Sequence, residues 1–293
     1  MSLHGLMSVT MGVPNVGETA AYYADFGLSP QAGSWFSTVD AGRQLRIVHA
    51  PTRRLVEMRV GVDDADDLGR AAASLARLGL PRMMHAASLA ATEPVTGMRV
   101  FLDVAPRVQQ APAPASIYNG PGRPDRRDDR APFFARPGRV RPRKLGHAVL
   151  GSVDHRATTS FFVDGLGFKV SDRIKDVGAF MRCSTDHHTS WQVDDVDEVG
   201  RGAFAMLEGR PERHVWGLGR HYAGSNFFWY LKDPAGNFSE YYSDMDCIVD
   251  DQLWTPEDLE GARGLFAWGP PPPASFLHPE DLAAMMTGAH AAR

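Results

Sequence analysis

Three side chains in the second half of the chain are of the kinds that hold a transition metal: His147, His188 and Glu240. Each lies in or beside a separate short run of β-favouring residues. Two imidazoles and one carboxylate bind one side of a divalent ion and leave its other positions open. Such a site suits non-haem Fe(II), where a substrate and O₂ bind the same ion. A single histidine at a strand start is more often a packed or surface residue, so the surrounding pattern must decide.

The chain repeats itself, and the repeat shows where these residues lie. The segment VDDADDLGRAAA at Val62–Ala73 matches VDDVDEVGRGAF at Val193–Phe204, with seven of twelve positions identical at an offset of 131 residues. A second pair, Ser8–Leu28 and His147–Phe168, follows the same order of strand, turn, helix and helix-ending glycine. Each half therefore holds two strand–helix–strand units of a duplicated architecture.

The two halves differ at the positions of the candidate ligands. Where the second half has the two histidines and the glutamate, the first half has Ser8, Glu57 and an apolar residue that we assign as Phe101. Core packing alone does not predict this asymmetry. The difference between the halves therefore favours a metal site in the second half over three unrelated buried or surface residues.

These units indicate an α+β protein with mixed or antiparallel sheet. Asp63 or Asp64, and Asp194 or Asp195, are suited to cap the helices that follow the VDD segments. A stretch rich in Pro, Gly, Arg and Asp separates the halves and is typical of a linker or surface loop. The expected organisation is a first domain without metal, the linker, a metal-binding domain and a tail: residues 1–110, 111–143, 144–246 and 247–293.

Composition limits the partners. A formal net charge of -4 gives no reason to expect nucleic acid or an anionic membrane. No apolar run is long enough to span a bilayer, and the N-terminus does not resemble a signal peptide. Two cysteines, Cys183 and Cys247, are expected to be free thiols in a cytoplasmic protein.

Longer motifs in the second half resemble a known family. LGHAVLGSVDHRATTSFFVDGLGF, HHTSWQVDDVDEVGRG and WGLGRHYAGSNFFWYLKDPAGNFSEYY look like the type I extradiol ring-cleavage dioxygenases of the vicinal oxygen chelate superfamily. The motif likeness covers about Lys144–Asp244, and the architecture covers both halves. The resemblance implies paired βαβββ modules whose mixed sheets curl around a cavity, with the metal in the second domain only.

The resemblance also implies roles for single residues. His147, His188 and Glu240 would hold Fe(II), with Mn(II) as an alternative, and the partners would be an aromatic diol and O₂. His221 and Tyr230 fall on the residues that hydrogen-bond oxygen and substrate at the metal. Such donors stabilise the negative charge that builds up during ring cleavage. The family also suggests a homo-oligomer. Three other histidines match no ligand position and are expected to be surface or structural: His155, His214 and His278.

One segment is shorter than both the repeat and the family pattern predict. The family has a DHH turn with an acid–base histidine and, a strand and a loop later, a metal-binding HHxxWxVDD. Here a single pair, His187 and His188, serves both motifs. Trp35 to Val62 spans 27 residues in the first half, whereas Phe180 to Val193 spans 13, so about one strand and one loop are missing.

Two explanations of the short segment stay open. Either the protein has lost a strand, or a stretch is absent from the sequence. We favour the second, because an interior strand that is lost leaves unpaired backbone. If the loss is real, His188 is the metal ligand, His187 has no assigned role and the acid–base histidine is gone. Ring cleavage would then be impaired, because deprotonating a catechol requires a base within hydrogen-bond reach.

Two other readings of the site are possible. A glyoxalase-like lyase or isomerase has the same fold and typically uses a four-ligand metal shell. A drug-sequestering protein or a degenerate dioxygenase would bind a ligand without cleaving it. Aromatic residues such as Trp191, Trp216 and Phe227 suit an aromatic substrate but are more often core. The tail, with Trp254 and Trp268, leaves open a cavity cover or an oligomer contact.

Overall fold

A computed structural model describes the chain from residue 3 to residue 277 with short gaps. The described residues are 3–113, 117–131, 134, 136, 138–175, 177–188 and 191–277. Among them, no helix has the length and apolar character needed to cross a membrane. Both cysteines are free thiols, as expected. His278, expected to be surface or structural, lies outside the described residues.

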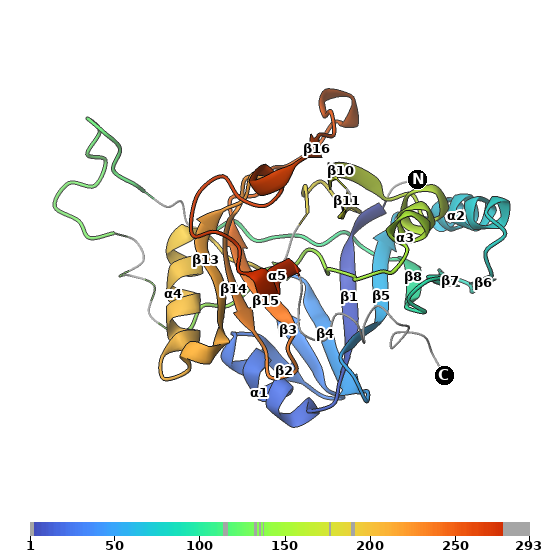
Figure 1. The fold of residues 1–293 in the computed structure, drawn as a ribbon, viewed down its shortest axis with the longest axis horizontal. Coiled ribbons are helices and arrows are strands. Elements are labelled where there is room, and N and C mark those ends of the chain that lie inside the picture. The colour runs from blue at the N-terminus through green and yellow to red at the C-terminus, as the bar shows by residue number, and fades with distance from the viewer. Residues whose placement is uncertain are drawn as a thin grey trace.

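The first half forms one eight-stranded mixed sheet (Figure 1). Its elements are β1 (Leu3–Val13), α1 (Val16–Asp25), β2 (Ser29–Gln31), β3 (Trp35–Thr38), β4 (Gly42–His49), β5 (Arg54–Val62), α2 (Ala65–Arg77), β6 (Arg82–Met84), β7 (Ser88–Thr92) and β8 (Arg99–Val104). The strand order is β2-β3-β4-β1-β5-β8-β7-β6. At its centre β1 lies parallel to β4 and antiparallel to β5, and β5 lies parallel to β8.

The second half repeats this plan in two separate sheets. Its main elements are β9 (Lys144–Leu145), α3 (His155–Ser160) with a π-helical end η2 (Phe161–Gly165), β10 (Lys169–Ile174), β11 (Gly178–Arg182), β12 (Trp191–Gln192), α4 (Val196–Leu207), β13 (His214–Arg220), β14 (Phe227–Lys232), β15 (Phe238–Ser243), β16 (Asp258–Leu259) and α5 (Ala274–Leu277). The sheets are β13-β14-β15-β12-β9 and β11-β10-β16. Helix α4 covers the outer face of β13, β14 and β15 (Figure 1).

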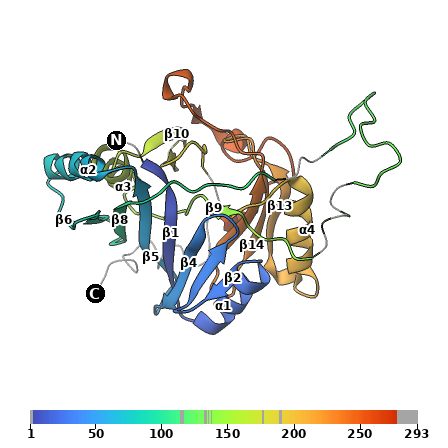
Figure 2. The ribbon, with the colours of Figure 1, turned by 180° about the vertical axis from the view of Figure 1, so that it is seen from behind.

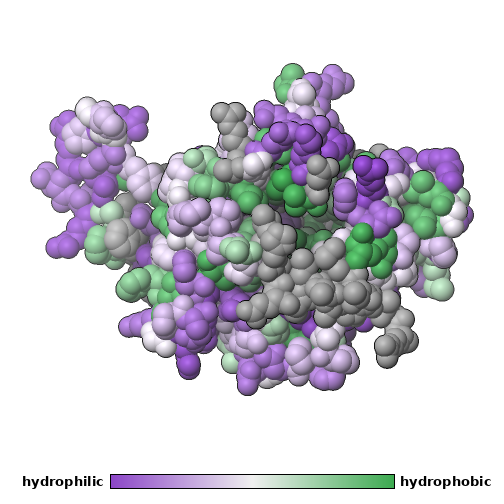
Figure 3. Space-filling view, in the orientation of Figure 1, coloured by the Kyte–Doolittle hydropathy of each residue, from purple (hydrophilic) through white to green (hydrophobic). Residues whose placement is uncertain are grey.

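Helix caps and segment order agree with the sequence. The side chain of Asp64 accepts the Asp67 N–H at the start of α2, and Asp195 accepts the Glu198 N–H at the start of α4. The described part of the linker at 117–131 projects from the body as a hydrophilic loop (Figure 3). The helices and mixed sheets of both halves confirm the predicted α+β architecture.

The split between the two sheets lies at the short segment. In the second half, β12 runs parallel to β15 and antiparallel to β9, as β5 does to β8 and β1. The counterpart of β4, which would join β9 to β11, is missing from the described residues. Strand β4 lies inside the 27-residue interval from Trp35 to Val62, so the shorter interval from Phe180 to Val193 accounts for the absence of its counterpart among the described residues.

Two expected strands are shorter than predicted for the same reason. The sequence indicated a strand through His147, but β9 ends at Leu145, and β12 has two residues. In the first half β1 has eleven residues and is paired on both sides. A strand without a neighbour on one side has fewer backbone hydrogen bonds to hold it extended. His147 and His188 therefore lie on irregular backbone, and only Glu240 lies within a strand.

Strand β9 lies near one end of β4 of the first half (Figure 2). A side chain from β4 takes the place of the missing neighbour of β9. The amide of Gln44, which is 1% exposed, accepts the Leu145 N–H at 2.6 Å and donates to the Leu145 carbonyl at 3.2 Å. It also donates to the Leu6 carbonyl at 3.0 Å. The backbone that we expected to be unpaired is thus hydrogen-bonded, which lowers the cost of losing the strand.

The change Gln44→Leu is expected to lower the free energy of unfolding by about 3 kcal/mol, because it leaves several buried backbone groups without partners. Urea denaturation followed by circular dichroism measures the change. Gln31→Leu, at an exposed position of β2, is the matched control and is expected to shift stability by less than about 0.5 kcal/mol. Equal stability of the two variants would show that Gln44 does not hold β9.

The halves share one buried core. Helix α1 and its C-cap residue Phe26 pack against β15: the Phe26 and Tyr241 rings are stacked 3.9 Å apart, and the Tyr22 hydroxyl lies 2.6 Å from Ser239 Oγ. Trp191 lies in the same cluster, 6.1 Å from the Phe26 ring. The helix of the first unit therefore supports the strand that carries Glu240, and it fixes the position of that strand.

Candidate metal centre

The predicted ligands come together because their segments are neighbours in the five-stranded sheet. Residue Trp191 pairs with Leu145 on one side and Tyr241 on the other. This register brings the segment after β9, the segment before β12 and the middle of β15 to one end of the sheet. His188 is 8% exposed and Glu240 is 2% exposed, so both lie inside the protein.

The candidate side chains lie near one another, but their distances are not those of residues that already coordinate an ion. The ring centres of His147 and His188 are 5.5 Å apart, and those of His188 and His221 are 6.2 Å apart. His221 Nε2 lies 3.6 Å from Glu240 Oε1. Within the described residues, no three His, Cys, Asp or Glu side chains converge as they stand on a point that could hold an ion. Binding an ion would require these side chains to move together.

The chemistry of the donors fits a divalent ion. Burial, with the neighbouring His221, lowers the pKa of His147 to about 3, and burial lowers the pKa of His188 well below its usual value. Both imidazoles are therefore neutral near pH 7, which is the form that binds metal. His147 Nδ1 is buried without a hydrogen-bond partner, which is the condition of a donor atom that awaits a ligand.

Two further predicted residues lie beside Glu240. Tyr230 pairs directly with Glu240 between β14 and β15, and its hydroxyl lies 3.1 Å from His221 Nε2. Burial and the Glu240 carboxylate raise the pKa of the Tyr230 phenol well above its usual value, so it stays a hydrogen-bond donor. His221 Nδ1 contacts the Leu265 carbonyl, which can only accept, so that nitrogen carries a proton. His221 Nε2 is therefore the ring nitrogen that faces the Tyr230 hydroxyl and the Glu240 carboxylate.

The structure adds residues that the sequence analysis did not assign. Asn226 is fully buried and donates to Glu240 Oε1 at 3.2 Å, which orients the carboxylate. At Gly224, with a φ of 78°, a Cβ would lie 2.8 Å from the His188 ring, so a side chain there would displace the histidine. Both residues belong to the segment GRHYAGSN of the motif quoted above, so the motif could have indicated that they lie at the site. His187 is also fully buried and lies 2.7 Å from His188, Nδ1 to Nδ1.

A cavity of about 410 Å³ opens beside these residues. His221 and Asp172 line it, together with Trp254 and Glu257 of the tail. Trp254 also packs 5.3 Å from the His187 ring and donates to the Ser171 carbonyl at 2.7 Å. The tail therefore forms part of the wall beside the candidate site.

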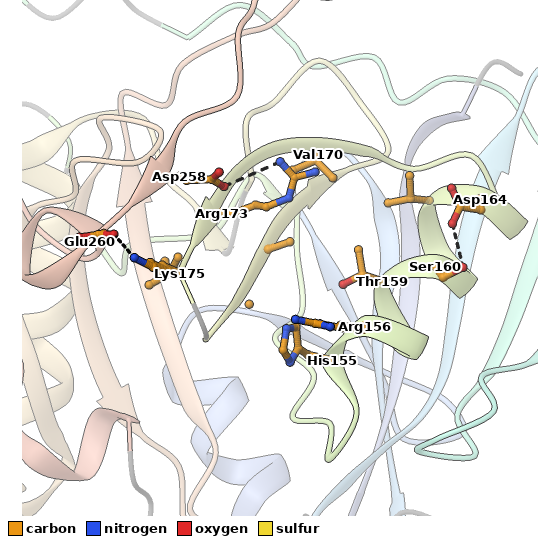
Figure 4. A pocket seen from close by; sticks show the side chains of 14 residues that line it. His155, Arg156, Thr159, Ser160, Asp164, Val170, Arg173, Lys175, Asp258 and Glu260 are labelled. Carbon is orange, nitrogen blue, oxygen red and sulfur yellow. Dashed lines mark hydrogen bonds and ion pairs between the residues drawn. The ribbon is translucent and has the colours of Figure 1, made fainter.

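A larger cavity of about 650 Å³ lies away from the candidate ligands, between α3 and the β10–β11 hairpin (Figure 4). None of the five predicted site residues is among the described residues that line it. Two of its cations are already paired, Arg173 with Asp258 at 3.9 Å and Lys175 with Glu260 at 2.5 Å. Those two cations are therefore already neutralised by carboxylates of the tail.

The other histidines and tryptophans named from the sequence lie on the surface or in the core, as their structural interpretations predicted. His155 is exposed at the start of α3, and His214 is exposed and accepts the Trp229 indole N–H at 3.1 Å. Trp191 and Trp216 are buried at 5% and 1% exposure. Both tryptophans are core residues, although Trp216 lies 5.8 Å from the Tyr230 ring.

Sequence relatives are ring-cleaving dioxygenases by name. The chain is 38% identical over 155 residues to metapyrocatechase 2 of Cupriavidus necator, a match that covers 47% of this chain and 48% of that protein. It is 25% identical over 157 residues to the manganese-dependent 2,3-dihydroxybiphenyl 1,2-dioxygenase of Geobacillus genomosp. 3, covering 45% and 50%. The chain thus spans about half the length of these relatives. No family model matches it.

Solved structures share the fold over nearly the whole chain. The Mn(II)-bound glyoxalase from Novosphingobium aromaticivorans superposes with a TM-score of 0.71 at 24% identity, covering 93% of each chain. The 2,2',3-trihydroxybiphenyl 1,2-dioxygenase from Sphingomonas wittichii gives 0.68 at 19% identity, covering 92% of this chain and 99% of that one. The fold is that of the vicinal oxygen chelate proteins. With the sequence matches, it confirms the resemblance to the type I extradiol dioxygenases.

Proposed function

We propose that this protein is an extradiol dioxygenase, which opens an aromatic ring next to two vicinal hydroxyl groups and inserts both atoms of O₂. The observation that carries the proposal is a pair of neutral imidazoles, half-buried His147 and buried His188, whose ring centres lie 5.5 Å apart in the same sheet region as the buried carboxylate of Glu240. These three residues would hold Fe(II). The bound ion would supply a Lewis acid and a path for electrons between diol and O₂.

The surrounding residues would orient the diol and manage its protons. Tyr230 is a half-buried phenol whose raised pKa keeps it protonated, so it can donate to a substrate oxygen and stabilise negative charge there. His221 lines the 410 Å³ cavity, through which a single-ring or two-ring diol could reach the site.

The experiment is anaerobic reconstitution with Fe(II), followed by addition of catechol, 3-methylcatechol or 2,3-dihydroxybiphenyl and then air. We expect uptake of one O₂ per diol and a yellow ring-opened product. Parallel reconstitution with Mn(II) tests the alternative ion, which the name of the Geobacillus relative suggests. Metal-loaded protein that gives no colour and no O₂ uptake with any diol would refute the proposed activity.

A glyoxalase-like lyase or isomerase is the second candidate. This candidate is supported by His221, whose Nε2 lies 3.6 Å from Glu240 and could serve as a fourth metal ligand. Glyoxalase-like enzymes typically hold their metal with four protein ligands. The same Mn(II)-loaded and Fe(II)-loaded protein is assayed with a thiol adduct of an α-keto aldehyde. Turnover of the adduct without O₂ uptake would favour this class, and diol binding without any turnover would indicate a ligand-binding protein. A homo-oligomer in the cytoplasm remains part of the leading proposal.

A further inference from the structure

A buried line of hydrogen bonds leads away from His188. His187 Nδ1 lies 2.7 Å from His188 Nδ1, and His187 Nε2 lies 2.8 Å from Asp172 Oδ2 on β10. Exposure along the line is 5% for Asp172, 0% for His187 and 8% for His188. His187 has no open path to solvent, so it can act on the site only through its neighbours.

The carboxylate at the far end determines the direction of every hydrogen bond in the line. Asp172 Oδ1 accepts the Glu257 N–H at 2.8 Å, so Oδ2 is the atom that faces His187. An ionised carboxylate only accepts, so His187 Nε2 must donate. A neutral imidazole that is protonated at Nε2 has a lone pair on Nδ1. His187 Nδ1 therefore accepts from His188 Nδ1, and the lone pair of His188 is left on Nε2.

We propose that Asp172 and His187 are positioning residues that hold His188 in the tautomer whose Nε2 can bind the metal. The inference rests on the proposed function, since it takes His188 as a ligand. Partners that fix the tautomer and orientation of a metal-binding histidine usually include one carboxylate or carbonyl in direct contact. Here the contact is relayed through a second histidine, which gives His187 the role that the sequence left unassigned.

The surroundings hold the relay in place. The backbone of His187 donates its N–H to the Asp246 carbonyl at 3.0 Å and accepts from Ser171 Oγ at 2.7 Å. The Trp254 ring lies edge-on to the His187 ring at 5.3 Å. The His187 side chain is 0% exposed and both of its backbone groups are hydrogen-bonded. Its Nε2 therefore faces Asp172 and not solvent. The short connection between β11 and β12 is what places the relay histidine directly before the ligand.

The test uses Asp172→Asn in the full-length protein. The Glu257 N–H would hold the amide oxygen, so the amide nitrogen would face His187 and donate to Nε2. In each of the two imidazoles the proton would then lie on the other ring nitrogen: His187 would be protonated at Nδ1 and His188 at Nε2. We expect Mn(II) affinity, measured from the signal of the free ion in electron paramagnetic resonance, to fall about 10- to 100-fold. The control is Asp103→Asn, which removes the charge of a carboxylate on β8 that pairs with Arg59 on β5. This variant is expected to bind Mn(II) with unchanged affinity.

A measurement on the metal-free wild type removes any dependence on how the variant folds. Long-range ¹⁵N–¹H spectra of protein labelled with [¹⁵N]histidine report which nitrogen of each ring is protonated. We expect Nε2–H at His187 and Nδ1–H at His188. The opposite pair of tautomers, or equal Mn(II) affinity of wild type and Asp172→Asn, would overturn the inference. A wild type with the expected tautomers that binds no Mn(II) or Fe(II) would instead overturn the proposed function.

Discussion

Replacing Glu240 with alanine is expected to abolish metal retention and ring cleavage together. Glu240 is the one carboxylate of the proposed ligand set, and the two imidazoles beside it are neutral. Loss of a residue that only supports a ligand costs about 10- to 100-fold in metal affinity or activity. Removing the ligand itself should exceed that, so we expect at least a 10³-fold loss of turnover. Metal analysis after gel filtration and O₂ uptake measure the two effects.

The metal-free variant separates this role from a structural one. Glu240 is 2% exposed, so its charge costs desolvation energy in the absence of an ion. The metal-free Glu240→Ala protein should therefore unfold at no lower urea concentration than the metal-free wild type. Glu57→Ala, which removes a glutamate that is ion-paired on β5, is the control and should retain metal. Full metal retention by Glu240→Ala would show that the glutamate is not a ligand.

The second large effect is expected for Tyr230→Phe, which removes only the phenolic oxygen. We expect turnover to fall about 10²- to 10³-fold, the cost of deleting one preorganised donor to a developing charge. Metal content should not change, because Tyr230 is not among the proposed ligands. Burial keeps the pKa of this phenol above its usual value, so the donor persists through neutral and mildly alkaline pH. Single-turnover kinetics with the reactive diol measures the loss.

A matched tyrosine controls for general effects of removing a buried hydroxyl. Tyr23 on α1 is 3% exposed, and its hydroxyl lies 3.4 Å from Asp233. Tyr23→Phe should leave turnover within about twofold of wild type, because a stability change in the folded protein does not alter the chemical step. A Tyr230→Phe enzyme as fast as the control would exclude Tyr230 from the reaction.

The sequence determined the local features of this protein. The helix caps could be predicted to one of two neighbouring aspartates in each half, and the structure selects Asp64 and Asp195. The order of strands and helices and the missing strand could also be predicted, because each depends on nearby residues or on comparison of the two halves. The assignments of His147, His188, Glu240, His221 and Tyr230 came from the repeat and from the family resemblance. Of these five, His188, His221 and Glu240 are buried and the other two are half-buried, and the roles of all five stay predictions.

Only the tertiary structure decided which partners complete the site. Gln44 bonds Leu145 across 101 residues of chain, and Asp172 meets His187 from a strand that lies on another sheet. A side-chain amide or carboxylate has no periodicity that predicts a distant partner, because the contact depends on how sheets and loops pack. The histidine pair was visible in the sequence, whereas the carboxylate that would set its protons could be found only by folding the chain.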